Sequence, residues 1–461
     1  SLALVRRHIK SGSGRSFSSD GALQARLLEL LPFSLTSSQS EALEVINQDM
    51  ASNQKMVRLL QGDVGSGKTV IALLALLKVV EAGTQGVLMA PTEILTRQHL
   101  KTIEPICEKL GLTCAVLTAK EKGKKRVDCL EKLQSGEIDI LIGTHALLEE
   151  AVQFKDLGIV VIDEQHRFGV HQRLVLQEKG QADLLVMTAT PIPRTLTLTY
   201  YGDMDVVRLT EKPAGRKPIA TRVLPEGKIS EIIEGLHRAI KAGRQAYWVC
   251  PLVEESDLLD ATAAIERHRE LEKRFPGKVG LVHGRMKPSE KDKIMALFAA
   301  GEISILVATT VIEVGIDVAN ASIMIVEHAE RFGLSQLHQL RGRVGRGSAE
   351  SSCLLVYSGK LGVVAEERLK IMRDTEDGFL IAEEDMRLRG AGEVLGVRQS
   401  GNPEFKCADL PAHLPLLEVA RDDAKLVLEK DPFLKSERGQ NLKTLLYLFD
   451  RISAIKLLQA G

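Results

Sequence analysis

The sequence has no long run of apolar residues and no signal peptide at its start. A helix that crosses a membrane needs about 20 consecutive apolar residues. A secretory signal needs a charged start followed by an apolar stretch and a cleavage site. These two absences argue against a membrane protein and against a secreted one, and we expect a soluble protein.

Cysteine is scarce, and the cysteines that are present are scattered without a CxxC pair. A disulfide framework or a zinc site would need clustered cysteines, so both are disfavoured. A reduced, cytoplasmic setting fits this distribution better, and we predict a bacterial cytoplasmic protein associated with the nucleoid. The six positions are Cys107, Cys114, Cys129, Cys250, Cys353 and Cys407.

The chain also lacks a net charge, because 61 basic residues balance 61 acidic ones. Bulk charge therefore gives no argument for nucleic-acid binding, and any such site must be a local patch or must use backbone amides. Apolar residues make up 44% and charged residues 26%, which is ordinary for a globular protein. At about 100–200 residues per domain, 461 residues predict about three domains.

Short apolar runs alternate with helical stretches along most of the chain, which indicates parallel sheets covered by helices on both faces. The alternation pauses at the proline- and glycine-containing segment 211–217, restarts, and fades after residue 357, where a charged helical part follows. We therefore predict an α/β fold with two successive units, 32–212 and 213–360, and a mainly helical segment, 361–461. The predicted strands are Val57–Leu60, Gly86–Met89, Ile138–Ile142, Ile159–Ile162, Leu184–Met187, Ala246–Cys250, Gly280–Val282, Ile303–Ala308, Ile323–Val326 and Cys353–Tyr357.

Residues 1–31 form a basic, serine- and glycine-containing stretch that ends in a predicted helix over Ala22–Leu31. We interpret this stretch as a linker or the remnant of a preceding domain, with a DNA-contacting arm as the alternative. Residue 1 is serine instead of methionine. We therefore expect the chain to be part of a longer protein.

The strongest local signal is the glycine-rich segment Gly62-Asp-Val-Gly65-Ser-Gly67-Lys68-Thr69, which fits the phosphate-loop pattern GxxxxGK[ST]. It follows an apolar strand and precedes an apolar helix, as this pattern requires. The glycines let backbone amides face phosphates, and the helix N-terminus adds a favourable dipole. Lys68 is placed for the β- and γ-phosphates of ATP, and Thr69 for Mg²⁺.

Two acidic residues, Asp163 and Glu164, follow the buried run Ile159–Ile162. Carboxylates at the end of a buried strand are costly unless they serve a cation or a reaction. We predict that Asp163 binds Mg²⁺ and that Glu164 orients and deprotonates the attacking water.

In their order along the chain, these motifs resemble those of superfamily 2 helicases. The resemblance implies two tandem RecA-like lobes that hydrolyse ATP between them. Asp163-Glu-Gln-His is then a DExH box, and the segment from Thr188 to Thr190 couples ATP state to the grip on nucleic acid. Thr36 and Gln39 match the family motif that reads adenine.

The second lobe carries Gln339-Leu-Arg-Gly-Arg343-Val-Gly-Arg346-Gly, which resembles helicase motif VI. Arginine stays charged and forks around phosphate oxygens. The resemblance implies that Arg343 and Arg346 are arginine fingers for the γ-phosphate. A segment that resembles motif V implies that Gly315 and Asp317 lie near the nucleotide.

Several strand ends are candidates for contact with the DNA backbone through amides and hydroxyls. For each of them, an ordinary strand-to-helix turn is an equally good interpretation. These candidates are Thr92, Thr144, His283 and Thr309.

After the second lobe, the block from Ala382 to Gly401 resembles the translocation (TRG) motif shared by the RecG family and transcription–repair coupling factors. The Gln165-His-Arg-Phe-Gly and Gln399-Ser-Gly versions look like the RecG family. In our hypothesis, Arg387 and Arg389 join this block to the lobes and Gln399 belongs to the lever that moves duplex DNA. The alternative for the arginines is ordinary surface salt bridges.

Two features depart from the family pattern. Ala391 replaces the proline of an Arg-Gly-Pro-Gly-Glu segment, so we expect a more mobile glycine-rich loop over 389–401. Members of the family also carry an N-terminal wedge domain with an OB fold, whereas only the linker precedes the first lobe here.

The resemblance implies an ATP- and Mg²⁺-dependent translocase on duplex DNA that regresses stalled forks and migrates Holliday junctions in recombination and repair. The resemblance implies that the partner is branched or duplex DNA and that no membrane is involved. A single-stranded DNA-binding protein is a further candidate partner, and the motor is implied to be monomeric. The alternatives are a translocase of the transcription–repair coupling type, a phosphate-loop kinase or non-motor ATPase, and a clamp that no longer turns over.

Overall fold

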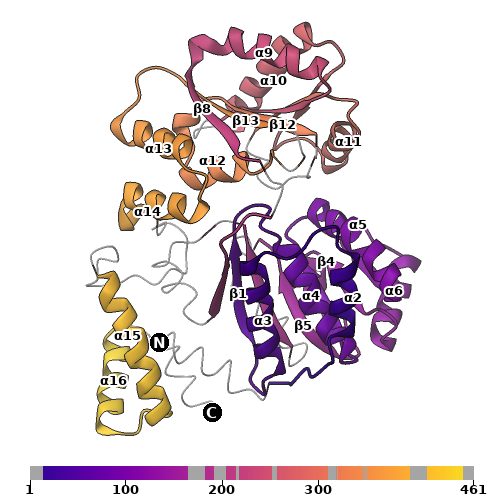
Figure 1. Cartoon of the computed structure of the whole chain (residues 1–461), viewed down its shortest axis with the longest axis vertical. Helices are drawn as coiled ribbons and strands as arrows, with labels where there is room; N and C mark the ends of the chain where they lie inside the picture. The colour runs from indigo at the N-terminus through magenta and orange to yellow at the C-terminus, as the bar shows by residue number, and fades with distance from the viewer. Residues whose placement is uncertain are drawn as a thin grey trace.

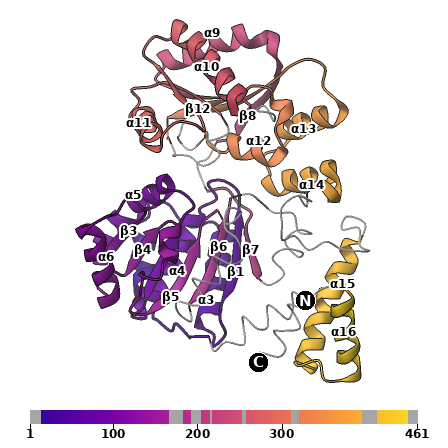
Figure 2. The same ribbon diagram turned by 180° about the vertical axis from the view of Figure 1, so that it is seen from behind.

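The computed structural model describes residues 14–164, 182–189, 204–213, 217–251, 257–309, 320–345, 350–394 and 413–449, with the single residues 191, 318 and 347. These residues form two α/β units, one above the other along the long axis of the molecule, and a helical C-terminal part (Figures 1 and 2). The fold class that we predict is confirmed.

The first unit is built on a parallel sheet whose seven described strands follow the order β3-β4-β2-β5-β6-β1-β7. The strands are β1 (Val57–Gly62), β2 (Gln85–Met89), β3 (Cys114–Leu117), β4 (Ile140–Gly143), β5 (Leu157–Ile162), β6 (Asp183–Thr188) and β7 (Asp205–Leu209). The helices around it are α2 (Ala22–Leu30), α3 (Ser37–Ala51), α4 (Lys68–Glu81), α5 (Glu93–Leu110) and α6 (Lys124–Ser135).

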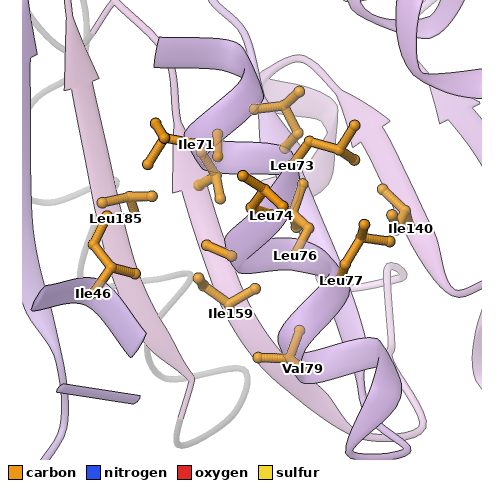
Figure 3. Packing of buried hydrophobic residues seen from close by; sticks show 14 of the residues in the cluster. Ile46, Ile71, Leu73, Leu74, Leu76, Leu77, Val79, Ile140, Ile159 and Leu185 are labelled. Carbon is orange, nitrogen blue, oxygen red and sulfur yellow. The ribbon is translucent and has the colours of Figure 1, made fainter. Parts of the chain in front are cut away.

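Helix α4 is the centre of the first core, because apolar residues surround almost its whole circumference (Figure 3). Ile71 and Leu74 are fully buried together with Ile159 and Leu185 of the sheet. Burial of one such side chain contributes about 1.5–3 kcal/mol. A Cβ on Gly86 of β2 would lie 2.5 Å from Leu76 Cδ2, so the helix packs closely on the sheet only because residue 86 is glycine.

The second unit repeats this design with six described parallel strands in the order β10-β11-β9-β12-β13-β8. The strands are β8 (Ile219–Pro225), β9 (Gln245–Val249), β10 (Val279–Val282), β11 (Ile305–Ala308), β12 (Ala321–Val326) and β13 (Ser351–Tyr357). Its helices are α9 (Ile229–Lys241), α10 (Asp257–Arg274), α11 (Pro288–Ala299), α12 (Leu334–Arg341) and α13 (Val363–Asp374).

All ten strands that the apolar runs predict are present, but three strands were missed. The missed strands, β3, β7 and β8, lie at the edges of their sheets. Their residues are largely half-buried or exposed, as in the alternating pattern of β8. Strands β7 and β8 contain charged residues and so lack the continuous apolar run that marks a strand covered on both faces, and β3 has only four residues.

The C-terminal part contains α14 (Gly378–Val394), α15 (Leu414–Lys430) and α16 (Glu437–Leu448). Helix α14 contacts α12 and α13 of the second unit. The glycine-rich segment does not begin as a loop at residue 389, because α14 continues through Ala391 to Val394. The expected mobility of this segment stays a prediction. Alanine is the best helix former, whereas the proline of the family pattern would interrupt a helix interior.

Residues 14–30 lie against the first unit more closely than a solvated linker would. Phe17 is 1% exposed and Leu27 is fully buried. The predicted helix is present as α2, which packs on α4 and α5. In the part of the chain that the structure describes, no helix combines the length and the apolar character needed to span a membrane.

Asp183, at the start of β6, gives a prediction about stability and pH. Its side chain is buried and accepts a hydrogen bond from the Met56 amide at 2.8 Å. Burial raises the pKa of Asp183 to about 7, against the lowering effects of the Met56 amide and of Lys55. The folded pKa exceeds the unfolded one, so this residue contributes stability that is complete at low pH and is lost as pH rises through about 7.

The substitution Asp183→Asn removes this titration and keeps an acceptor for the Met56 amide. We expect the variant to exceed the wild type in unfolding free energy by about 1–3 kcal/mol at mildly alkaline pH, with a smaller difference in acid. Urea unfolding at several pH values measures the difference. A gain of the same size at every pH would contradict the assignment.

Candidate nucleotide and nucleic-acid sites

The order of the first sheet brings the predicted ATP-site segments together. Strands β5, β6 and β1 are neighbours and parallel, so the segments after them meet at one edge of the sheet. A cavity of about 370 Å³ lies at this edge and is lined by both units. Its lining includes Phe33, Gln39, Val64, Gly65, Gly67, Lys68, Thr69, His99, Asp163, Glu164, Ala189, Pro213, Gln339 and Arg343.

The phosphate loop is closed on itself by Lys68. The Lys68 ammonium donates to the carbonyls of Gly62 and Asp63, at 2.8 Å each. Gly67 has a φ of 88°, and helix α4 begins at the next residue. A side chain at position 67 would be strained by this backbone and would meet the Gln39 amide nitrogen at 2.3 Å. The loop therefore presents the N-terminus of α4 to the cavity, an arrangement that suits phosphate.

Thr36 and Gln39 form a capping box at the start of α3. The Gln39 carbonyl oxygen accepts from the Thr36 amide at 2.9 Å, and its side-chain nitrogen donates to the Ser66 carbonyl at 2.8 Å. Gln39 thus holds the phosphate loop through the Ser66 carbonyl and also lines the cavity. Its contact with adenine stays a prediction.

Asp163 and Glu164 face the same cavity with opposite shifts in acidity. Burial would raise the pKa of Asp163, but the hydrogen bond to His99 and the charge of Lys68 outweigh burial and lower it. Burial raises the pKa of Glu164, and the neighbouring charge of Asp163 adds to this rise. A carboxylate that stays ionised suits a cation, and one that binds protons more readily suits a general base.

His99 is a residue of this site that the sequence reasoning missed. It lies on α5, and its Nε2 is 2.8 Å from the Asp163 carboxylate. No local motif marks it, because its partner is 64 residues away in the sequence. The signal is in the topology, since α5 follows β2 and β2 pairs with β5, the strand that ends before Asp163.

The second unit contributes Gln339 and Arg343 to the cavity. The positive charge of Arg343 partly offsets the rise in the pKa of Glu164 that burial and Asp163 cause. Arg341, two residues earlier, has a different position: it is 2% exposed and donates to the carbonyls of Met372 at 2.7 Å and Thr375 at 2.8 Å. Of these two arginines, only Arg343 lines the cavity.

The residues predicted to contact DNA fall at other strand ends. Thr92 and Thr144 follow the adjacent strands β2 and β4, and His283 and Thr309 follow the adjacent strands β10 and β11. An ion pair of 2.9 Å between Lys120 and Asp292 joins the two units. Lys120 lies in the segment between β3 and α6, and Asp292 lies on α11, which follows β10.

These four side chains are not equally accessible. Thr144 is 5% exposed and Thr309 is 1% exposed, and the Thr92 hydroxyl accepts from the Leu95 amide at the start of α5. His283 is half-buried, and its pKa is lowered by burial and by the charges of Lys291 and Arg285. A backbone phosphate would therefore meet amides and basic side chains more readily than threonine hydroxyls.

The remaining predicted residues are divided between described and undescribed parts. Thr188 is buried at the end of β6. Arg387 is exposed and pairs with Glu384 at 2.7 Å and with Glu367 of α13, so it fastens α14 to the last helix of the second unit. Thr190, Gly315, Asp317, Arg346, Gln399 and the side chain of Arg389 lie outside the described residues.

Three family models match the chain in order. "DEAD/DEAH box helicase" matches residues 36–199, and "Helicase conserved C-terminal domain" matches residues 227–348. "ATP-dependent DNA helicase RecG, domain 3, C-terminal" matches residues 375–446. The first two models cover most of the two sheet units, and the third covers most of the helical C-terminal part.

Curated relatives and a solved structure give the same family. The ATP-dependent DNA helicase RecG of Escherichia coli strain K12 is 49% identical over 439 residues, which is 94% of this chain and 63% of the relative. The RecG of Bacillus subtilis is 51% identical over 413 residues, 89% of this chain and 60% of the relative. A RecG structure bound to a three-way DNA junction aligns with a TM-score of 0.76 and 44% identity, over 90% of this chain and 55% of that one. The chain thus spans less than two thirds of these relatives.

Proposed function

Because the chain belongs to the RecG family of DNA helicases, we propose that it is an ATP-dependent translocase on duplex DNA that remodels branched junctions. The observation that carries the proposal is the cavity between the units, where Lys68 and Glu164 of the first meet Arg343 of the second. A phosphate-loop kinase or a simple ATPase does not need an arginine from a second sheet unit. A motor does, because hydrolysis must change how the two units are held together.

In this proposal, the nucleotide lies in the cavity with its phosphates at the start of α4. Lys68 leaves the loop carbonyls and binds the β- and γ-phosphates, and Glu164 takes the proton of the attacking water. Arg343 binds the γ-phosphate from the second unit, and Arg346 assists it. We also propose adenine contacts for Thr36 and Gln39 and nearby positions for Gly315 and Asp317.

Thr69 and Asp163 are the proposed Mg²⁺ ligands. Among the described residues there is no cluster of three or more His, Cys, Asp or Glu that would form an all-protein metal site. The donors at the cavity suit Mg²⁺, which favours one or two carboxylates together with phosphate and water oxygens. When bound, this ion neutralises charge that develops on the phosphates.

For the track, we propose that duplex DNA lies along the strand ends that carry Thr92, Thr144, His283 and Thr309. The basic residues beside His283, Lys291 and Arg285, supply a local positive field in a chain without net charge. Closure of the units around ATP and reopening after hydrolysis would move these two groups of contacts relative to each other.

The C-terminal part completes the proposed motor. Asp385 of α14 accepts a hydrogen bond from Ser335 of α12 at 2.9 Å, so α14 is attached to the helix that precedes Arg343. We propose that the segment around α14, with Arg389 and Gln399, converts opening of the cleft into a step along DNA. The residue divisions 32–212, 213–360 and 361–461 are part of this proposal.

The wider setting is also proposed. We expect a monomeric motor with a single-stranded DNA-binding protein as a further partner, in the cytoplasm of a bacterium. The matched relatives are bacterial and act on DNA by their names. A role in transcription–repair coupling is not favoured, because the family model that matches the C-terminal part is that of RecG.

The proposal predicts that forked or duplex DNA raises ATP hydrolysis by this chain severalfold. Coupled assays of phosphate release, with and without a synthetic fork, a plain duplex and a single strand, measure the effect. Phosphate transfer to a small molecule instead of water would favour the kinase alternative. If none of these DNA molecules changed the rate of ATP hydrolysis, the proposed motor function would be excluded.

A further inference from the structure

A chain of three polar side chains runs from the phosphate loop to the start of α14. The Asp63 carboxylate and His338 Nε2 are 2.5 Å apart. His338 Nδ1 and Arg341 Nη2 are 3.0 Å apart, and Arg341 Nη1 donates to the carbonyls of Met372 and Thr375. His338 and Arg341 are 5% and 2% exposed, so water competes little for these bonds.

The partners of His338 fix how its ring is protonated. A guanidinium has only donors, so Nδ1 must accept from Arg341. Nε2 faces a carboxylate, so it must carry the hydrogen and donate to Asp63. His338 therefore donates to Asp63 on one side and accepts from Arg341 on the other, so a movement of either neighbour changes the orientation of the imidazole ring.

The far end of this chain is the turn between α13 and α14. Arg341 holds the turn at Thr375, and the Glu376 carboxylate pairs with Lys212 at 2.5 Å and accepts from the Ile219 amide at 2.5 Å. Lys212 and Ile219 flank the proline-containing connection between the two sheet units. The turn is thus fastened to the second unit and to the connection between the units.

Gly378, the first residue of α14, lies against the Asp63 end of the same series of hydrogen bonds. A Cβ on Gly378 would be 2.7 Å from His338 Nε2, 2.9 Å from Pro191 Cγ and 3.2 Å from Asp63 Cγ. Residue 378 therefore touches the phosphate loop, the segment after β6 and His338 together. Helix α14 therefore starts against the Asp63 side chain of the phosphate loop as well as against the second unit.

We propose that His338 is a positioning residue that couples the phosphate loop to α14. The proposal rests on the proposed function, because such coupling has a meaning only in a motor. Its physical basis is Lys68, which now binds the carbonyl of Asp63 and must leave it to reach a phosphate. The backbone that carries the Asp63 carboxylate then changes, and His338 passes that change to Arg341 and to the start of α14.

Two substitutions at His338 separate its hydrogen bond to Asp63 from its hydrogen bond to Arg341. In His338→Asn, the amide oxygen takes the place of Nδ1 and still accepts from Arg341, but nothing reaches Asp63. In His338→Gln, the amide nitrogen takes the place of Nε2 and still donates to Asp63, but Arg341 loses its acceptor. The matched control is His268→Asn, on α10 of the same unit, where Nε2 lies 3.3 Å from the Val279 carbonyl and away from the cleft.

The measurements are DNA-stimulated ATP hydrolysis and displacement of a triplex-forming strand from duplex DNA by the same protein. Their ratio gives the ATP consumed per length of duplex travelled. We expect both His338 variants to raise this ratio about 5- to 150-fold, the range of ordinary coupling between sites. The KM for ATP should stay at the wild-type value. Each variant leaves one buried polar group without its partner, so a small fall in melting temperature is expected in both, and the control variant should match the wild type in both activities.

Other outcomes would overturn the proposal in distinguishable ways. If hydrolysis and translocation fell together in both variants, His338 would have a structural role and the motor would stand. If only His338→Asn uncoupled them, the arm through Arg341 would be excluded. If the wild type showed no stimulation by any DNA, the proposed function itself would fail, whatever the variants did.

Discussion

Replacement of Glu164 by glutamine is expected to stop ATP hydrolysis while nucleotide binding persists. Glutamine keeps the shape of the side chain but cannot take a proton from water. Loss of a general base typically lowers the rate about 10²- to 10⁴-fold. Single-turnover hydrolysis and binding of a fluorescent nucleotide, measured on the same preparation, separate the two effects.

The acidity of Glu164 makes this prediction dependent on pH. Burial and the charge of Asp163 raise the pKa of Glu164, so the base is lost to protonation at a higher pH than an exposed glutamate would be. We expect the rate constant of the wild type to fall as the pH is lowered through this raised pKa. Asp163 keeps its charge through the same range, because its pKa is lowered.

Asp163→Asn provides the comparison for Glu164→Gln, because it removes the neighbouring charge without removing the base, and it keeps an oxygen that can accept from His99. It should raise the Mg²⁺ concentration that hydrolysis requires and shift the acid limb of the pH profile to lower pH. Hydrolysis by Glu164→Gln at a rate close to that of the wild type would exclude the base assignment.

The fold could be predicted from the sequence for the central strands and for the edge strand β10, and not for the three edge strands β3, β7 and β8. The central strands read as unbroken apolar runs because helices cover both sides. Strands β3, β7 and β8 alternate or are short because one side faces solvent. The end of α14 was missed for another reason, since the glycines around Ala391 suggested a loop although alanine permits the helix to continue.

The parts of the candidate site that lie within single sequence motifs could be predicted. Lys68, Glu164 and Arg343 each stand in a segment whose order and spacing indicate phosphate chemistry, and the structure brings these three side chains to one cavity. His99 and His338 could not be predicted, because their partners are distant in sequence and only the strand order and the approach of the two units bring them together.

The second large effect is expected for Arg343→Ala. Arg343 lines the same cavity as Lys68 but belongs to the other unit, so in the proposed mechanism it would contact the γ-phosphate only when both units close on the nucleotide. Loss of such an arginine lowers hydrolysis about 10³- to 10⁵-fold in phosphoryl-transfer enzymes. The substitution Arg343→Lys keeps the charge but not the planar fork, and it should recover only a small part of the rate.

Arg341 supplies the contrast that identifies the role of Arg343. Arg341→Ala would leave the carbonyls of Met372 and Thr375 without their donor in a buried place, which costs about 1–3 kcal/mol for each unsatisfied group. We therefore expect Arg341→Ala to lower the melting temperature markedly and Arg343→Ala to change it little.

Steady-state hydrolysis, nucleotide affinity and thermal unfolding of both variants test this division between two arginines in one motif. A two-unit ATP site requires that Arg343→Ala binds ATP, keeps its fold and fails at the chemical step. If Arg343→Ala hydrolysed ATP at the wild-type rate, the first unit would be a complete catalyst by itself. The second unit would then be a passive neighbour, and hydrolysis would have no direct means of moving it.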